Sequence, residues 1–402
     1  MNRRFLAASV VLLTVALAVA AGIVMRCAGR RPSRLDRSAA GSVERVEGAA
    51  VSRLQRIPLY RTWLRAERLR SGTLAGDGTL HVEVDLRAAI EPRLAAIGLT
   101  GGSDLLPASA RGTIVAEGVP ARTTAPALRE SWSFDGHAGL FDLLDRDPAG
   151  SGATVALDAI PGAPTAMVRV RLVPARLADP SLGGAAFASW RDRASFVEKL
   201  LGRPLRAEIA EDLAGPAVFA LYDTEDDAEA EAVLAVELRR SDRLAGLLDT
   251  LFGLAALTER VTVRRYRGVS TGSFHARSGG PGVALAVDGP VLFVATSRAR
   301  LEAAIDARRA LPRPPGVVAR GGDPAASWSA VSESAFVAHG WARLARSAVE
   351  PRAQDAMTIA ALRPEGATGW RLEGHGPGPA ISADPVLPFL RSVYGGRQRD
   401  GD

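Results

Sequence analysis

Short runs of alternating hydrophobic and polar residues dominate the chain beyond residue 70, and stretches with helical spacing lie between them. The segment TLHVEVDL shows the alternation most clearly, because leucine and valine fall on one face of an extended chain and His81, Glu83 and Asp85 on the other. This period of two predicts a half-buried strand. The same reasoning predicts further strands at 113–117, 154–160 and 167–173, and helices at 90–98, 140–144, 187–201 and 205–213.

Hairpins flanked by helices are predicted between residues 217 and 312. AVFALY and AVLAVEL are two strands joined across an acidic loop, and VTVRRYRGVSTGSF, GVALAVDG and PVLFVAT are three more. Asp288-Gly289 marks a tight turn between the last two strands. Ser241 and Ser297 can each cap a helix, and the second of these helices is expected to end near Pro312.

The resulting order, β-α-β-β-β-α, predicts an α+β fold in which antiparallel sheets are covered by helices. A looser version of this unit recurs before residue 181 and part of one after residue 330, so the sequence suggests repeated β-α-β-β-β-α units. We expect a first α+β unit at 51–180, a second at 181–312, and a C-terminal α+β segment with a disordered tail at 313–402.

A long uncharged run lies at the start of the chain. After a short basic tail at 1–4, residues 5–25 form an uncharged run of 21 residues, long enough to cross a bilayer as one N-terminal transmembrane helix. A cleaved signal peptide is the main alternative, because Ala18-Val19-Ala20 has the A-x-A pattern of a cleavage site after Ala20. Lipidation at Cys27 is disfavoured, since Met25-Arg26 lacks the small residues of a bacterial lipobox.

The flanks of this run bear on orientation and on membrane contact. Residues 26–50 are rich in Arg, Ser, Gly and Ala and are predicted to form a tether. More arginines follow the span than precede it, which by the positive-inside rule favours a cytoplasmic body, but the four-residue tail is typical of exported signal sequences. We therefore expect a single-pass membrane protein with a periplasmic or extracellular body.

Residues 59–70 are predicted to form a basic amphipathic helix that either packs into the body or lies on anionic headgroups.

Composition excludes several functional classes. The chain has 402 residues, 47% hydrophobic and 23% charged, an ordinary globular balance. Its net charge of +6 comes from arginines interleaved with acidic residues, not from a basic stripe with aromatic platforms, so no nucleic-acid partner is expected. Cys27 is the only cysteine, which excludes disulfides and thiolate metal sites within the body.

The sequence Gly268-Val269-Ser270-Thr271-Gly272 matches the G-x-S-x-G pattern of serine hydrolases, and His275 lies five residues beyond the serine. A nucleophile elbow needs a strand, a strained turn carrying the serine, and then a helix. Here Ser270 lies within a strand-like run, and HARSGGPG follows without a helix. We expect Gly268 to mark a bulge or a close backbone approach. A cryptic hydrolase using Ser270 stays an alternative.

No other residues form a recognisable catalytic, cofactor or metal site. The five histidines lack metal-ligand spacing, and the acidic loop 223–231 lacks the alternation and fixed glycine of an EF-hand. GGPG at 279–282 precedes a strand, and Lys199 is far from any glycine loop, so no phosphate cradle is expected. The histidines are His81, His137, His275, His339 and His375.

The run from AVLAVELRRSDRLAGLLDTL through YRGVSTGSF to GVALAVDGPVLFVATSRARLEAAIDA resembles a family of bacterial signal-anchored extracytoplasmic proteins of unknown function, over about a third of the chain. The resemblance implies an N-terminal span and an extracytoplasmic body, but no catalytic residue, cofactor or substrate. We therefore expect a non-enzymatic, membrane-tethered module that binds a protein or envelope component. The alternatives are a small-ligand or lipid-binding module and the cryptic hydrolase.

Overall fold

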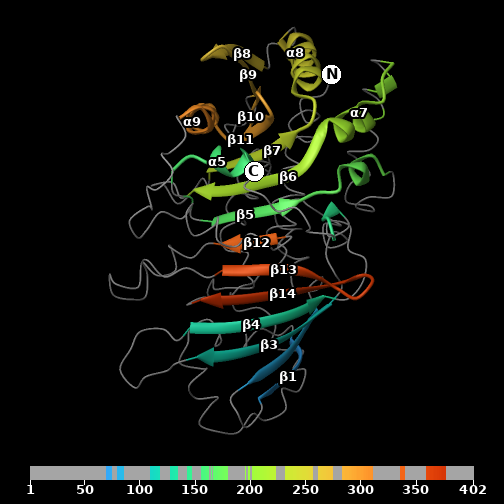
Figure 1. Ribbon diagram of the computed structural model, residues 1–402, viewed down its shortest axis with the longest axis vertical. Coiled ribbons are helices and arrows are strands. Elements are labelled where there is room, and N and C mark those ends of the chain that lie inside the picture. Colours follow the sequence, from blue (N-terminus) through green and yellow to red (C-terminus); the bar gives the residue numbers. More distant parts are fainter. Residues whose placement is uncertain are drawn as a thin grey trace, which may run out of the picture.

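The computed structural model places fourteen strands in one antiparallel sheet that runs the length of the molecule (Figure 1). It describes the residues that form or adjoin regular elements, namely 69–74, 79–85, 109–117, 127–134, 143–146, 155–162, 164, 166–179, 195, 198–199, 202–222, 231–256, 261–274, 283–310, 336–339 and 359–376. The strands follow the order β1-β2-β3-β4-β14-β13-β12-β5-β6-β7-β11-β10-β9-β8. The fold is therefore α+β, with helices packed on an antiparallel sheet.

The strands of the first half are β1 (Leu69–Leu74), β2 (Leu80–Asp85), β3 (Ser109–Glu117), β4 (Ala127–Phe134) and β5 (Ala166–Arg171). The second half contributes β6 (Leu213–Tyr222), β7 (Glu231–Leu238), β8 (Val261–Tyr266), β9 (Val269–Phe274), β10 (Val283–Asp288) and β11 (Val291–Ala295). The last three are β12 (Phe336–His339), β13 (Ile359–Glu365) and β14 (Gly369–Gly376).

The strands nearest the C-terminus lie in the middle of the sheet. β14 pairs with β4 over seven residue pairs from Trp370↔Phe134 to Gly376↔Leu128, and β12 pairs with β5. Strands β14, β13 and β12 thus lie between β4 and β5, and β5 in turn pairs with β6. Strands from all three expected units share one sheet, and the unit boundaries stay a prediction.

Two helices cover opposite faces of the sheet in the region of β7 to β11. α9 (Arg298–Arg309) places Leu301, Ala304 and Ile305 in a fully buried cluster with Phe293 of β11. α8 (Ser241–Ala256) packs on the other face, where the ring of Phe252 lies over Gly272 of β9. Hydrophobic side chains on both faces explain why these strands have nearly continuous apolar sequences.

Most of the expected elements of the second half are confirmed. Ser297 caps α9 by accepting a hydrogen bond from the backbone N–H of Arg300, as its position before the helix predicts. The helix over 205–213 is α7 (Leu205–Asp212), and α8 begins at Ser241. The tight turn after Asp288 is present, with a positive φ of 52° at Gly289.

Two predictions of strands were wrong. Residues 154–160, expected to be a strand, contain the helix α5 (Val155–Asp158), whose first turn is fixed by a hydrogen bond from the Ala156 N–H to Glu237 Oε1 (3.0 Å). A short apolar run cannot distinguish the two structures. The run 261–274, expected to be one strand, is the β8–β9 hairpin, and β4 was not foreseen.

Several predictions fall outside the described residues. These are the basic tail 1–4, the anchor 5–25, the tether 26–50 with Cys27, the helix at 90–98 and the C-terminal tail. Of the amphipathic helix predicted at 59–70, only Leu69 and Arg70 are described, and they belong to strand β1, so that end of the prediction was wrong. Of the helix predicted at 187–201, only residues 195, 198 and 199 are described, and all three are helical. Of 140–144, residue 143 lies in a 3₁₀ turn and Leu144 forms a bridge with Leu172. No helix within the described part of the chain is long and apolar enough to cross a membrane.

Candidate functional site

Ser270 lies in a β-hairpin and not in a nucleophile elbow. Arg267 and Gly268 form the two-residue turn between β8 and β9, with positive φ angles of 49° and 83° at the two positions, as a type I′ turn requires. Ser270 follows on β9, half-buried and paired with Arg265 of β8. The turn joins two antiparallel strands, so the described chain around Ser270 lacks the strand–turn–helix order of an elbow. His275 lies outside the described residues.

The two glycines of the pattern have different structural roles. Gly268 was expected to mark a bulge or a close approach, and this was wrong, because it is a turn residue, and a Cβ added to it would meet nothing within 4 Å. The close approach is at Gly272, where a Cβ would lie 2.2 Å from Cε1 of Phe252. The G-x-S-x-G match thus combines a turn glycine with a packing glycine.

The histidines and the acidic loop form no metal site that the described residues reveal. His81 is exposed on β2, His339 and His375 belong to β12 and β14, and the other two lie outside the described residues. Of the acidic loop, Glu231 is described, and it accepts a hydrogen bond from Arg300 Nε (2.9 Å). Within the described residues, no three His, Cys, Asp or Glu side chains are grouped as metal ligands.

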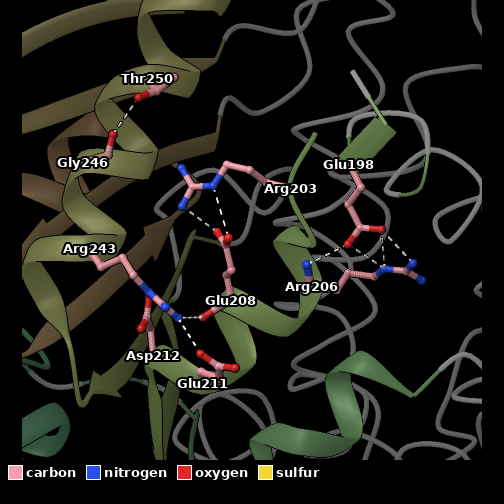
Figure 2. Close-up of polar contacts among 9 residues, drawn as sticks. All are labelled: Glu198, Arg203, Arg206, Glu208, Glu211, Asp212, Arg243, Gly246 and Thr250. Atoms are coloured by element: carbon pink, nitrogen blue, oxygen red, sulfur yellow. Dashed lines mark hydrogen bonds and ion pairs between the residues drawn. The ribbon is translucent and has the colours of Figure 1, made fainter. Parts of the chain in front are cut away.

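Charged residues around α7 form a structural network (Figure 2). Arg243 of α8 donates from Nε to the buried Asp212 (2.8 Å) and from Nη2 to the backbone oxygen of Glu208 (2.8 Å). Arg206 binds Glu198 through Nε and Nη2, and lowers the pKa of that carboxyl although burial opposes this. These contacts fix α7 against its neighbours, which accounts for the charges without a ligand.

A second network fixes the end of α9. Asp288, 3% exposed, accepts hydrogen bonds from Nε of Arg308 (2.7 Å) and from Nε and Nη2 of Arg309 (3.0 and 2.6 Å). Burial alone would raise the pKa of Asp288, but the two guanidinium groups outweigh it and lower that pKa to about 2. This network also has a structural role that requires no ligand.

The surface left without such an explanation is one face of the sheet, formed by β2, β3, β4, β14 and β13, which we call the polar face. On β3, β4 and β14, side chains alternate between a buried apolar face and the polar face. On the apolar side, Trp132 is 1% exposed and Leu372 0% exposed, and Arg146 stacks 4.9 Å over the ring of Trp370. The polar face carries His81, Glu83, Arg111, Thr113, Arg129, Ser131, Ser133, Arg363, Arg371 and Glu373.

The strand register aligns these residues in rows across the sheet. Arg363 of β13 pairs with Arg371 of β14, which pairs with Ser133, which pairs with Arg111 and then Glu83. We call this set the arginine row. Directly opposed side chains in an antiparallel sheet have Cβ atoms about 4.5–5.5 Å apart, so the side chains of Arg363 and Arg371 start side by side at one end of the row.

Carboxylates pair with two of the three arginines in the arginine row. Arg371 forms an ion pair with Glu365, and this lowers the pKa of the Glu365 carboxyl. Arg111, whose side chain is 69% exposed, lies 3.9 Å from Glu83, a weak contact. Arg363 is exposed and makes no ion pair with any residue that the structure describes. The next row contains Glu373, Ser131, Thr113 and His81, which offers hydroxyl and carboxylate groups beside the arginines.

The polar face was not predicted, although a signal for it exists. In ALRESWSF, residues 127–134, Arg129, Ser131 and Ser133 alternate with a series that is apolar except for Glu130. This is close to the pattern of a strand with one solvated face. The row itself could not be read from sequence, because it depends on β13–β14 lying beside β4.

The same face of the sheet has a different character further along. At β6, β7, β11 and β10 it carries Val218, Ala235, Phe293 and Ala286, all 0% exposed beneath α5 and α9. The described helices therefore cover this face in one half of the sheet and leave the polar face open.

Comparisons with known proteins give no further guide. A scan against protein-family models found no match. Searches of curated proteins and of solved structures found no match either.

Proposed function

We propose that this is a membrane-tethered extracytoplasmic protein whose body binds another protein or an envelope component through the polar face, without catalysing a reaction. The observation that carries the proposal is the opposition of Arg363 and Arg371 on an open sheet face. Like charges directly opposite each other destabilise a sheet. Glu365 already pairs with Arg371, so an anionic group of a partner beside Arg363 would remove the remaining cost.

A solvated face is the common state of one side of an antiparallel sheet, so openness alone would not support binding. Three features do. The face spans five strands, three of its arginines are aligned in a row, and hydroxyl side chains lie in the adjacent row. Arginine binds carboxylates through two parallel hydrogen bonds, which suits a partner that presents acidic side chains.

The tether is the second part of the proposal. It rests on the uncharged run 5–25 as a single transmembrane helix, on the tether 26–50, and on the resemblance to bacterial signal-anchored proteins. The body is then periplasmic or extracellular.

We also keep the internal repeat as a proposal, in modified form. The order β7-α8-β8-β9-β10-β11-α9 has the expected unit with one strand more, because the first strand after α8 is divided by the Arg267-Gly268 turn.

The two alternative functions receive no support from the described packing. The space between α9 and the sheet is filled by Phe293, Leu301 and Ile305, each 0% exposed, where a small-ligand or lipid module would need a cavity. The hairpin around Ser270 does not provide the elbow of a hydrolase.

Site-specific photo-crosslinking in native membranes tests the binding proposal. A photoreactive residue replaces Ser131 on the polar face, and in a second variant replaces the exposed Asp249 on α8. We expect a discrete adduct from position 131 only. We also expect Arg363→Gln plus Arg371→Gln to abolish it.

The matched control is Arg239→Gln plus Arg240→Gln, which removes the same charge from two exposed arginines between β7 and α8. Binding at the polar face is contradicted if both double variants lose the adduct equally. It is also contradicted if position 249 gives the same adduct. The tether is tested separately by protease accessibility in intact cells and spheroplasts. A body protected from external protease in spheroplasts contradicts the extracytoplasmic assignment.

A further inference from the structure

The edge strand β8 offers a second surface, distinct from the polar face. β8 is the last strand of the described sheet and pairs with β9 alone (Figure 1). Its central residues Val263, Arg264 and Arg265 are exposed, and Val263, at 42%, is one of two large hydrophobic residues exposed among those described. An apolar side chain at the middle of an open edge is a feature that most proteins avoid.

The turn determines which backbone groups of β8 are free. In a two-residue hairpin the residues flanking the turn, Tyr266 and Val269, form a hydrogen-bonded pair, and such pairs recur at every second residue. Arg264 therefore faces β9, and Thr271 Oγ1 donates to its carbonyl oxygen (3.1 Å), which agrees with this assignment. By alternation, the N–H and C=O groups of Val261, Val263 and Arg265 point away from the sheet.

The charges along β8 indicate what pairs with these groups. Arg264 and Arg265 project to opposite faces of the sheet, and neither makes an ion pair with a residue that the structure describes. By contrast, Arg267 at the turn is bound to Asp306 of α9 (2.7 Å), which also accepts a hydrogen bond from the Tyr266 hydroxyl (2.8 Å). The turn is thus fixed to the body, while two arginines flank the open edge.

We propose that β8 binds an extended acidic polypeptide segment, which adds to the sheet as a further strand. Its backbone pairs with Val261, Val263 and Arg265, and its acidic side chains lie beside Arg264 on one face and Arg265 on the other. A second copy of β8 is a poor occupant. Antiparallel pairing centred on Val263 would place the two Arg264 side chains at diagonal positions, about 7–8 Å apart, without a carboxylate between them.

The test measures peptide binding to the full chain in nanodiscs by fluorescence anisotropy. The probe is a fluorescein-labelled peptide, Thr-Glu-Glu-Val-Glu-Glu-Thr, which can present glutamate on both faces. One control peptide has lysine in place of glutamate, and another has the same sequence with alternate backbone nitrogens methylated. We expect the first peptide to bind, and each control to bind at least about tenfold more weakly, which corresponds to about 1.4 kcal/mol.

Val263→Pro separates strand pairing from simple charge attraction. Proline removes the outward N–H of residue 263 while leaving the bonds to β9, and edge strands tolerate it. We expect Val263→Pro to weaken the acidic peptide about tenfold or more, and Val263→Thr, which keeps the N–H, to change affinity less than about twofold. Equal affinity of the two variants, or undiminished binding of the methylated peptide, overturns the proposal.

A charge swap covers the case in which Val263→Pro does not fold. Arg264→Glu plus Arg265→Glu should exchange the preference from the glutamate to the lysine peptide, and an unchanged preference overturns the proposal. Sedimentation of the wild type that shows dimers abolished by Val263→Pro would identify a second copy as the occupant and would also overturn it. Arg363→Gln plus Arg371→Gln should leave peptide binding unchanged, so a failure here is distinct from a failure at the polar face.

Discussion

Gly272 of β9 lies directly beneath the ring of Phe252 of α8, so close that a Cβ on residue 272 would be 2.2 Å from Cε1 of that ring. Phe252 is fully buried, so a shift of its ring would have to displace other parts of the interior. The same arrangement occurs in the other half of the sheet, where a Cβ on Gly112 would lie 2.4 Å from Cε3 of Trp132, its cross-strand partner. In both places a missing side chain lets an aromatic ring lie flat on the sheet.

We predict that Gly272→Ala lowers the free energy of unfolding by about 2 kcal/mol or more, because the added methyl group overpacks a buried contact. Gly246→Ala is the matched control, since Gly246 is an exposed residue of α8 with nothing within 4 Å of its Cβ position. It should stabilise the protein by about 0.5–1 kcal/mol through helix propensity. Urea unfolding of both variants measures the difference. Equal effects would contradict the close packing.

The Arg243–Asp212 pair gives a second prediction. Asp212 is 1% exposed, and Arg243 supplies its described side-chain partner as well as a bond to the Glu208 carbonyl oxygen. Arg243→Ala should lower the free energy of unfolding by about 3 kcal/mol, because it leaves a buried carboxylate unpaired. The control is Arg203→Ala, which removes an ion pair of a half-exposed arginine with Glu208 and should cost at most about 1 kcal/mol. Similar losses in the two variants would show that the carboxylate is solvated.

Asp288 predicts a defined dependence of stability on pH. Its pKa falls from 3.8 to about 2 in the folded protein, so its ionised form is favoured by folding. That stabilisation is complete above about pH 4 and is lost as the pH falls towards 2, since the unfolded chain takes up the proton first. We expect the wild type to lose up to about 2 kcal/mol more stability than Asp288→Asn between pH 5 and pH 2.

Urea unfolding at several pH values in this window measures the difference between the two proteins. Asp249→Asn, on the exposed surface of α8, is the control for removal of a carboxylate. Parallel pH profiles of wild type and Asp288→Asn would contradict the prediction.

The elements that sequence predicted well are those whose burial depends on local pattern. β6, β7, β10 and β11 are almost continuously buried, and their apolar runs and flanking turns identified them. The Arg267-Gly268 turn was not predicted, because arginine at its first position replaces the asparagine or aspartate that usually signals a type I′ turn.

The arrangement of the sheet could not be predicted for a different reason. β14 is separated from its partner β4 by more than two hundred residues, and no local pattern encodes which strand a hairpin joins. The arginine row depends on that pairing, and so the candidate site was inaccessible from sequence even though each of its arginines is visible there.

The hairpin geometry at Ser270 predicts the outcome of a chemical test. A fluorophosphonate probe labels activated serines, and the β8–β9 hairpin around Ser270 lacks the elbow that activates a hydrolase serine. We expect no labelling of the folded protein above that of Ser270→Ala. Labelling that depends on Ser270 and on His275 would restore the hydrolase alternative.

Arg363 links the stability of the sheet to its proposed function. If its charge is retained for binding despite repulsion from Arg371, then Arg363→Thr should raise the free energy of unfolding by about 0.2–1 kcal/mol at low salt, since threonine also suits a strand. The gain should shrink as salt rises, because exposed charges are screened. Arg240→Thr, at an exposed position outside the sheet, controls for the loss of one positive charge.

The same Arg363→Thr variant should weaken the crosslink from position 131. A variant that is less stable than the wild type, yet crosslinks normally, would show that Arg363 supports the fold and does not serve a partner.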